Sequence, residues 1–135
     1  MWLDAGVPHW ILPVDDVDGV DLARIAPAIR AWRGFGAAGT NVDLVSWRGR
    51  ELLVRTWERG VEGETLACGS GLLASAQWAR LHASSSRTIR LRSRGGDRFQ
   101  VHADVDSRVL WLEGPAAIVY RGFIPVAMLR PRAGS

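Results

Sequence analysis

Hydrophobic and polar residues follow different periods along the chain, and the longer period predicts two helices. Apolar side chains at positions 22, 25, 29 and 32 share one helical face, so we expect a helix over residues 21–32 with Asp21 as its N-cap. Pro27 lies inside this stretch and is expected to kink or split the helix. A second helix, rich in Gly, Ala and Ser, is predicted over residues 69–82.

Shorter runs, in which apolar residues are continuous or alternate with polar ones, predict strands. The predicted strands are residues 9–16, 41–47, 51–58, 88–94, 98–104, 108–114 and 116–122. Residues 33–39 and 59–65, which are rich in glycine and polar side chains, are expected to be loops. No linker separates these elements, so we expect one α/β domain over residues 1–135, with a frayed tail at residues 130–135.

The composition is that of a compact domain. Hydrophobic residues make up 47% of the 135 positions and charged residues 23%, which is ordinary for a globular protein with a core. The net charge is only +3, and the seven tryptophans are expected in a core or an interface. No apolar run reaches transmembrane length, so we expect no membrane partner. A single cysteine cannot form an internal disulfide, which favours the cytoplasm.

That single cysteine, Cys68, lies where a predicted loop meets the predicted helix 69–82. The partial positive charge of a helix N-terminus stabilises a thiolate, so we expect the pKa of Cys68 to lie moderately below that of a free cysteine. The neighbouring glycines let a ligand approach the backbone, whose N–H groups can hold a carboxylate. A lone cysteine is also commonly a small buried apolar residue, so its placement leaves both a reactive and a structural thiol open.

The sequence around this cysteine, WERGVEGETLACGSG at residues 57–71, resembles the signature of the diaminopimelate epimerase family around the second of its two catalytic cysteines. LDAGVPH, GTNVDLV and LEGPAAIVYRG resemble further segments of the family's C-terminal lobe, in the same order. The resemblance implies an α+β lobe with a curled, mostly antiparallel sheet around a central helix. It also implies cofactor-independent inversion of an amino-acid α-carbon by two cysteines, one on each face of a small-molecule substrate, with diaminopimelate as the first candidate in lysine and cell-wall precursor biosynthesis.

The resemblance gives roles to the residues nearest the thiol. Cys68 is implied to be the catalytic acid/base. Gly69 and Ser70 are implied to offer backbone N–H groups to the substrate carboxylate at the reacting carbon, where they stabilise developing charge. His9 is implied to be catalytic and to help move the thiol proton. A histidine beside a proline is also compatible with a purely structural role.

Further matching positions are implied to bind the rest of the substrate. Glu58 is implied to be both catalytic and substrate-binding and to accept a hydrogen bond from an ammonium group of the substrate. Arg59 is implied to hold the distal carboxylate with its planar guanidinium. Asn41 offers an amide at the same end. A Glu–Arg pair at a strand end is also compatible with a surface salt bridge, and Asn41 with a turn. Val7 stands where many family members have Asn, which removes a polar contact and leaves room for a related amino acid.

The family has two lobes with one catalytic cysteine in each, whereas this chain resembles the second lobe alone. We therefore expect an epimerase that is complete only with a second lobe, supplied by a homodimer or by a separate N-terminal lobe. The alternative is a catalytically inactive lobe that acts as a binding or docking module. The apolar stretch at residues 123–129 is expected to be exposed unless a partner covers it.

Two other kinds of site are suggested by charged and metal-binding residue types in the sequence. Arg90, Arg92 and Arg94 alternate with apolar residues and form a basic stripe that is typical of nucleic-acid binding or of a solvated strand face. No aromatic residues interleave with the stripe, so we expect no nucleic-acid partner. Three scattered histidines and one cysteine do not have the spacing of a metal site, so none is expected.

Overall fold

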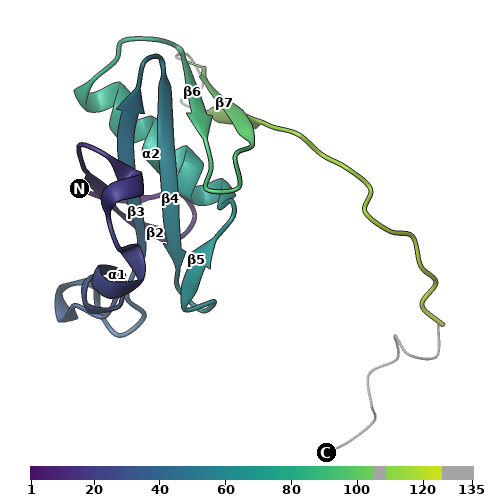
Figure 1. The fold of residues 1–135 in the computed structure, drawn as a ribbon, viewed down its shortest axis with the longest axis horizontal. Helices are drawn as coiled ribbons and strands as arrows, with labels where there is room; N and C mark the ends of the chain where they lie inside the picture. Colours follow the sequence, from purple (N-terminus) through teal and green to yellow (C-terminus); the bar gives the residue numbers. More distant parts are fainter. Residues whose placement is uncertain (105–108, 126–135) are drawn as a thin grey trace, which may run out of the picture.

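A computed structural model describes residues 1–104 and 109–125. An eight-stranded sheet curls around one central helix, in the strand order β1-β2-β3-β4-β6-β7-β8, with β5 paired to β4 (Figure 1). The strands are β1 (Trp2–Asp4), β2 (Pro8–Pro13), β3 (Asn41–Arg48), β4 (Glu51–Glu58), β5 (Gly63–Thr65), β6 (Thr88–Arg92), β7 (Arg98–Ala103) and β8 (Leu110–Glu113). The helices are α1 (Leu22–Arg30) and α2 (Gly69–His82), with 3-10 turns η1 (Val17–Gly19) and η2 (Arg33–Phe35).

The strand pairing makes the sheet mixed but mostly antiparallel. Only β2 with β3 and β4 with β6 run parallel among the described pairs, and α2 lies in the connection between β4 and β6. The remaining pairs are antiparallel. This confirms the predicted α+β class and the curled sheet around a central helix.

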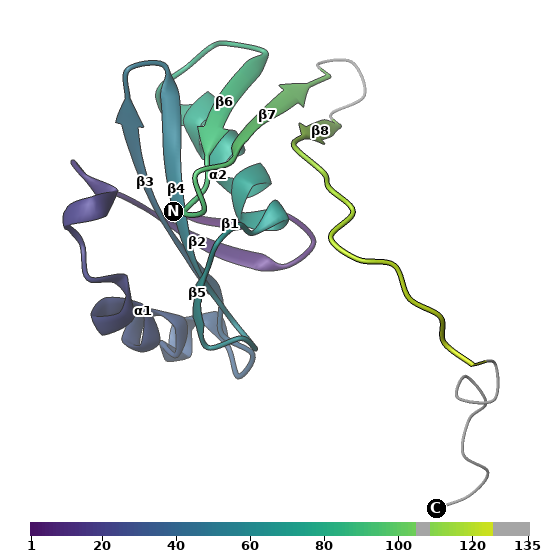
Figure 2. The ribbon, with the colours of Figure 1, turned by 45° about the vertical axis from the view of Figure 1, so that its right-hand side comes forward.

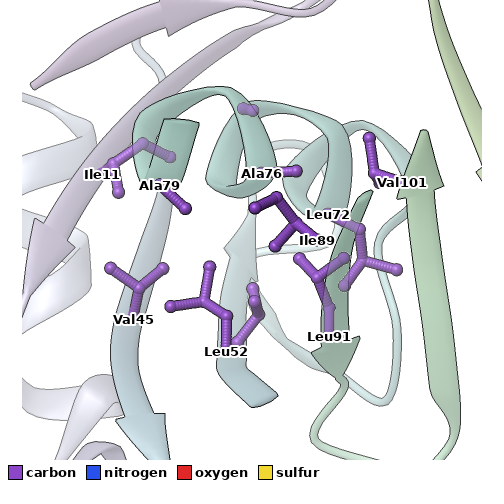
Figure 3. Packing of buried hydrophobic residues seen from close by; sticks show 11 residues of the cluster. Ile11, Val45, Leu52, Leu72, Ala76, Ala79, Ile89, Leu91 and Val101 are labelled. Atoms are coloured by element: carbon purple, nitrogen blue, oxygen red, sulfur yellow. The ribbon is translucent and has the colours of Figure 1, made fainter. Parts of the chain in front are cut away.

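The main core lies between the sheet and α2. The small side chains of Ala76 and Ala79 are fully buried and let the helix approach the strands closely. Figure 3 shows them beside Val45 and Leu52, which reach the helix from β3 and β4. Fully burying each such aliphatic side chain contributes about 1.5–3 kcal/mol relative to an exposed position. The packing therefore fixes α2, and its first residue, against the sheet.

The opposite face of the sheet carries a second core under α1. Side chains of β3 alternate, so that Val42 and Leu44 pack towards α1 whereas Val45 packs towards α2. Asp21 caps α1 by accepting a hydrogen bond from the Arg24 backbone N–H at 3.1 Å, as predicted. Pro27 lies within α1 and does not split it.

Three local predictions from the sequence were wrong. Strands β1 and β5 were missed, since each has three residues and too short a pattern to show alternation. The predicted strand 116–122 is not a strand. Residues 114–125 run away from the sheet in both views (Figures 1 and 2), and their apolar side chains are exposed, Tyr120 to 83% and Phe123 to 104%. Apolar alternation alone makes no strand without a neighbour to pair with. The predicted frayed tail lies outside the described residues.

The tryptophans contribute little to the core, where only Trp57 and Trp78 of the described chain pack partly buried against the two clusters. None of the seven is buried, and Trp2, Trp32, Trp47 and Trp111 are exposed. Their predicted place in an interface stays a prediction. Within residues 1–104 and 109–125, neither helix has the length and apolar character that a membrane span requires.

Candidate functional site

Cys68 lies at the point where the chain enters α2. It is the N-cap residue, with extended backbone angles of φ −126° and ψ 112°, and its carbonyl accepts the first helical hydrogen bond from the Leu72 N–H at 2.9 Å. The residue is 7% exposed. The predicted helix 69–82 is confirmed at both ends. A run of small residues follows the cap, and a Ser-rich segment follows the helix.

The environment of Cys68 favours its protonated form. Burial raises the pKa of the Cys68 thiol above its ordinary value, and the carboxylates of Glu58 and Asp43 add to this increase. Hydrogen bonding of the sulfur with Ser70 Oγ and with the Gly71 backbone N–H lowers this pKa without reversing the shift. The predicted lowering of this pKa at the helix N-terminus is therefore wrong, because desolvation outweighs the favourable end of the helix.

His9 lies in the core and is connected to the thiol through Ser70. It comes from β2 and is fully buried, and its ring contacts two elements. Its Nδ1 lies 2.6 Å from Asp43 Oδ2 on β3, and its Nε2 lies 3.0 Å from Ser70 Oγ at the start of α2. The parallel register of the strands, which pairs His9 with Asn41, brings these groups together. Cys68 Sγ lies 3.4 Å from the same Ser70 Oγ.

Asn41 links His9 to Arg59. Asn41 Nδ2 lies 3.2 Å from His9 Nε2, and Asn41 Oδ1 accepts from the Arg59 backbone N–H at 2.7 Å. The Arg59 guanidinium is half-buried and donates to the Gly39 carbonyl at 3.5 Å. Asn41 is 5% exposed. Its amide therefore braces His9 and the start of the β4–β5 turn.

Glu58 and Gly69 complete the set of residues singled out from the sequence. Glu58 ends β4 and accepts a hydrogen bond from Thr65 Oγ1 at 2.5 Å. Among the described residues no ion pair joins Glu58 to Arg59, so the alternative of a surface salt bridge does not apply. Gly69 is exposed at the first position of α2, where a helix has backbone N–H groups without intrahelical acceptors. The structure thus brings six of the seven predicted residues to the start of α2 or to His9 beside it, and Arg59 joins them through its backbone contact with Asn41.

Sequence reasoning missed two polar residues of this cluster. Asp43 is fully buried and Thr56 is 3% exposed, and Thr56 Oγ1 donates to Asp43 Oδ1 at 2.6 Å. A signal was present, because the period of two along β3 puts Asp43 on the same face as Asn41. A carboxylate inside an otherwise apolar strand is also unusual.

Gly71 allows α2 to begin so close to this carboxylate. A Cβ at this position would lie 2.6 Å from Asp43 Oδ1 and 2.8 Å from Thr56 Oγ1, both closer than van der Waals contact permits. The absence of a side chain therefore lets the first turn of the helix rest directly on the polar cluster. Because Ser70 and Cys68 are part of that turn, Gly71 also sets their distance from His9.

The arginine stripe is largely neutralised by carboxylates. Glu51 accepts from Arg92 at 2.5 Å and from Arg98 at 2.8 Å, and Arg94 lies 3.4 Å from Glu64. Arginines that pair with carboxylates in this way are typical of a solvated strand face. Within the described part of the chain no cluster of three or more His, Cys, Asp and Glu side chains is arranged to hold a metal ion.

Comparisons with known proteins point to one family. A family model described as Diaminopimelate epimerase matches residues 1–119. The diaminopimelate epimerase of Methanocella arvoryzae is 44% identical over 92% of this chain and 43% of its own length. That of Aquifex aeolicus is 35% identical over 90% of this chain and 44% of its own length. That of Gemmatimonas aurantiaca is 39% identical over 89% of this chain and 47% of its own length. The chain thus spans less than half the length of these curated relatives.

A solved structure shares the fold. The crystal structure of a phenazine biosynthesis protein PhzF family member from Enterococcus faecalis matches with a TM-score of 0.56 and 16% sequence identity. The match covers 73% of this chain and 35% of that one. At this level of identity the likeness concerns the fold alone.

Proposed function

The chain belongs to the diaminopimelate epimerase family, and we propose that it is the cysteine-bearing lobe of a cofactor-independent amino-acid epimerase that is complete only with a second lobe. The observation that carries the proposal is the placement of Cys68 at the N-terminus of α2, hydrogen-bonded through Ser70 to His9. A thiol in this position can exchange a proton with a substrate carbon, while the helix N-terminus binds the carboxylate beside that carbon.

The raised pKa of Cys68 supports a role as the proton donor in the resting lobe. Inversion requires one thiolate that removes the α-proton and one thiol that supplies a proton from the opposite face. Because burial keeps Cys68 protonated, it serves as the donor in the resting lobe, and a cysteine from the second lobe serves as the base. After one inversion the roles of the two sulfur atoms are exchanged.

The remaining residues bind the substrate. The backbone N–H groups of Gly69 and Ser70 stabilise the carboxylate as charge spreads into it. Glu58 accepts from an ammonium group, and the half-buried Arg59 guanidinium binds a distal carboxylate. Diaminopimelate has these groups and is the first substrate to test, although Val7 leaves room for a related amino acid. The second lobe is a second copy of this chain or a separate N-terminal lobe, and we place the protein in the cytoplasm because its one cysteine forms no internal disulfide.

The test is exchange of the α-hydrogen in D2O. The chain is incubated with diaminopimelate, alone and mixed with the N-terminal lobe of a family member, beside Cys68→Ala. We expect deuterium incorporation with inversion when both lobes are present, and its loss in Cys68→Ala, which keeps the cap geometry but has no thiol. Equal incorporation in the two proteins would contradict the proposal.

A second function is favoured by one observation. The exposed apolar side chains between residues 118 and 124 belong to a segment that pairs with no strand of the described chain. Such a segment fits a lobe that docks onto a partner and has no activity of its own. A stable complex with the partner lobe, without any cysteine-dependent exchange, is the outcome that selects this alternative.

A further inference from the structure

A continuous line of polar groups runs from the Cys68 thiol into the core. Cys68 Sγ lies 3.4 Å from Ser70 Oγ, Ser70 Oγ lies 3.0 Å from His9 Nε2, and His9 Nδ1 lies 2.6 Å from an oxygen of Asp43. The inner two side chains, His9 and Asp43, are fully buried. The line therefore leads from a residue that is only 7% exposed, Cys68, to two side chains that have no contact with solvent.

A single amide fixes the direction of these hydrogen bonds. The Arg59 backbone N–H can only donate, so the Asn41 atom that faces it at 2.7 Å is the oxygen. The Asn41 amide nitrogen therefore faces His9 Nε2 at 3.2 Å, and since an NH2 group can only donate, Nε2 is the acceptor. The ring proton of His9 is then on Nδ1, which donates to Asp43 Oδ2.

The same assignment orients the outer half of the line. With Nε2 as acceptor, the Ser70 hydroxyl donates to His9, and the Ser70 oxygen is left to accept from the Cys68 S–H. We propose that Asp43 is a positioning residue that holds His9 in this tautomer and stabilises the imidazolium formed when the thiol proton passes through Ser70 to His9. The inference rests on the proposed function, because it describes how Cys68 becomes the thiolate that removes the α-proton in the direction of inversion in which the other cysteine is the donor.

The proton transfer balances without any further reagent. The S–H bond of Cys68 breaks as the proton joins Ser70 Oγ, and the original hydroxyl proton of Ser70 moves to His9 Nε2. The products are a thiolate, an unchanged serine and an imidazolium paired with the Asp43 carboxylate. No electron is lost or gained.

The way in which Asp43 is held supports this role. Its second oxygen accepts from Thr56 at 2.6 Å, and the missing side chain of Gly71 lets the helix close over it. A buried carboxylate with neutral neighbours lowers the stability of a fold, so its position is not explained by packing. Formation of an imidazolium at His9 supplies the opposite charge that the resting cluster lacks.

Removing the charge of Asp43 tests the inference, because the two possible modes of action predict opposite changes in the reactivity of Cys68. Glu58 on β4 and Asp43 on β3 both raise the pKa of the thiol through space. If Asp43 acted on Cys68 through space alone, Asp43→Asn would lower this pKa and speed alkylation. If Asp43 acts through His9 and Ser70, the same substitution removes the stabilisation of the imidazolium and slows alkylation.

The first experiment measures alkylation of the full chain by iodoacetamide at pH 7, without substrate. We expect Asp43→Asn to react about tenfold more slowly, equivalent to about one unit in the thiol pKa. Asp15→Asn, which removes the same charge from an exposed position, is expected to react like the wild type. Faster or unchanged reaction in Asp43→Asn overturns the proposal.

The second experiment tests the path through Ser70 and remains informative if the Asp43 variant does not fold. Ser70→Ala removes the hydroxyl and is expected to slow alkylation about as much as Asp43→Asn, whereas Ser70→Thr keeps the hydroxyl and the rate. In the Ser70→Ala background, Asp43→Asn is expected not to slow alkylation any further, because only the through-space effect of its charge remains. A Ser70→Ala rate equal to that of the wild type, or an Asp43 effect of the same factor in both backgrounds, overturns the proposal. Because no substrate is present, neither result depends on epimerase activity.

Discussion

At the scale of single residues, the reactivity of Cys68 is set by opposing local effects. Burial and two carboxylates raise the pKa of the thiol, and two hydrogen bonds at the start of α2 lower it. One of the carboxylates, Glu58, is also the group proposed to bind a substrate ammonium. Pairing with that ammonium would cancel the effect of Glu58 on the thiol. Substrate binding itself would then ease the loss of the thiol proton.

This balance predicts the effect of removing the Glu58 charge. In Glu58→Gln the side chain can still accept from Thr65, but its negative charge is gone. The pKa of Cys68 is expected to fall, and alkylation below the midpoint is expected to be roughly two- to threefold faster, the size of a Coulomb interaction in a partly solvated site. The measurement is the iodoacetamide rate between pH 6 and 10.

A matched control for Glu58→Gln lies in the same turn. Glu62 is exposed, has a positive φ of 55°, and pairs with Arg30 at 2.6 Å. Glu62→Gln removes the same charge from the chain at a site that does not shift the pKa of the thiol, so its alkylation profile is expected to match the wild type. If Glu58→Gln leaves the midpoint unchanged or moves it upwards, the carboxylate does not act on the thiol as described.

At the scale of elements, the contact between α2 and β3 depends on a missing side chain. Replacing a helical glycine with alanine normally favours the helix by about 1 kcal/mol. In Gly71→Ala the new methyl group would collide with Asp43 and Thr56, so we expect the free energy of unfolding to fall by about 1–3 kcal/mol. Urea unfolding followed by tryptophan fluorescence measures the change.

Gly69→Ala provides the comparison within the same helical turn. A Cβ at position 69 lies 3.6 Å from Leu112 Cδ2, an ordinary contact, so we expect a change within about 0.5 kcal/mol. The two substitutions add the same atoms to the same helix. Equal effects would show that helix propensity, and not the contact with Asp43, decides the stability of this turn.

The sequence predicted the elements that have a long or well-bounded pattern. The helix 69–82 was predicted at both ends, and β3 and β4 within one residue, because their apolar periods extend over many residues and end at turns. The short strands β1 and β5 were missed, since three residues cannot show a period. Residues 116–122 have the alternation of a strand, but a strand also needs a neighbour, which the pattern cannot report.

For the candidate site, too, the sequence predicted some features, and only the three-dimensional structure revealed others. The seven residues taken from the motif do lie together, whereas Asp43 and Thr56 became visible as partners only through the register of β3 with β4, which pairs them. The sign of the pKa shift of Cys68 was also mispredicted. The helix N-terminus can be read from the sequence, but the burial that outweighs it arises from the packing of α2 against the whole sheet.

At the scale of the whole molecule, the exposed apolar segment after β8 is the feature that favours association with a partner. Residues 114–125 are exposed throughout, and Ile118, Val119 and Tyr120 present at least three-quarters of their surface to solvent. Association that covers these side chains is favoured by about 25 cal/mol for each Å² of apolar surface removed from water. A two-fold arrangement would cover two such segments at once and would bring two copies of Cys68 into one assembly.

We therefore expect the chain to be a dimer at micromolar concentration and to become monomeric when it is truncated after Glu113. Analytical ultracentrifugation measures both states. The substitution Tyr120→Asp, which places a charge in the segment, is expected to weaken the dimer, whereas Arg121→Gln, which changes an adjacent polar residue, is expected to leave it intact. Identical half-sites both supply Glu58 and Arg59, so an asymmetric substrate fits such a dimer poorly, and slow α-hydrogen exchange at most is expected from it. A wild-type chain that is monomeric at these concentrations would contradict the homodimer and leave a separate N-terminal lobe as the proposed partner.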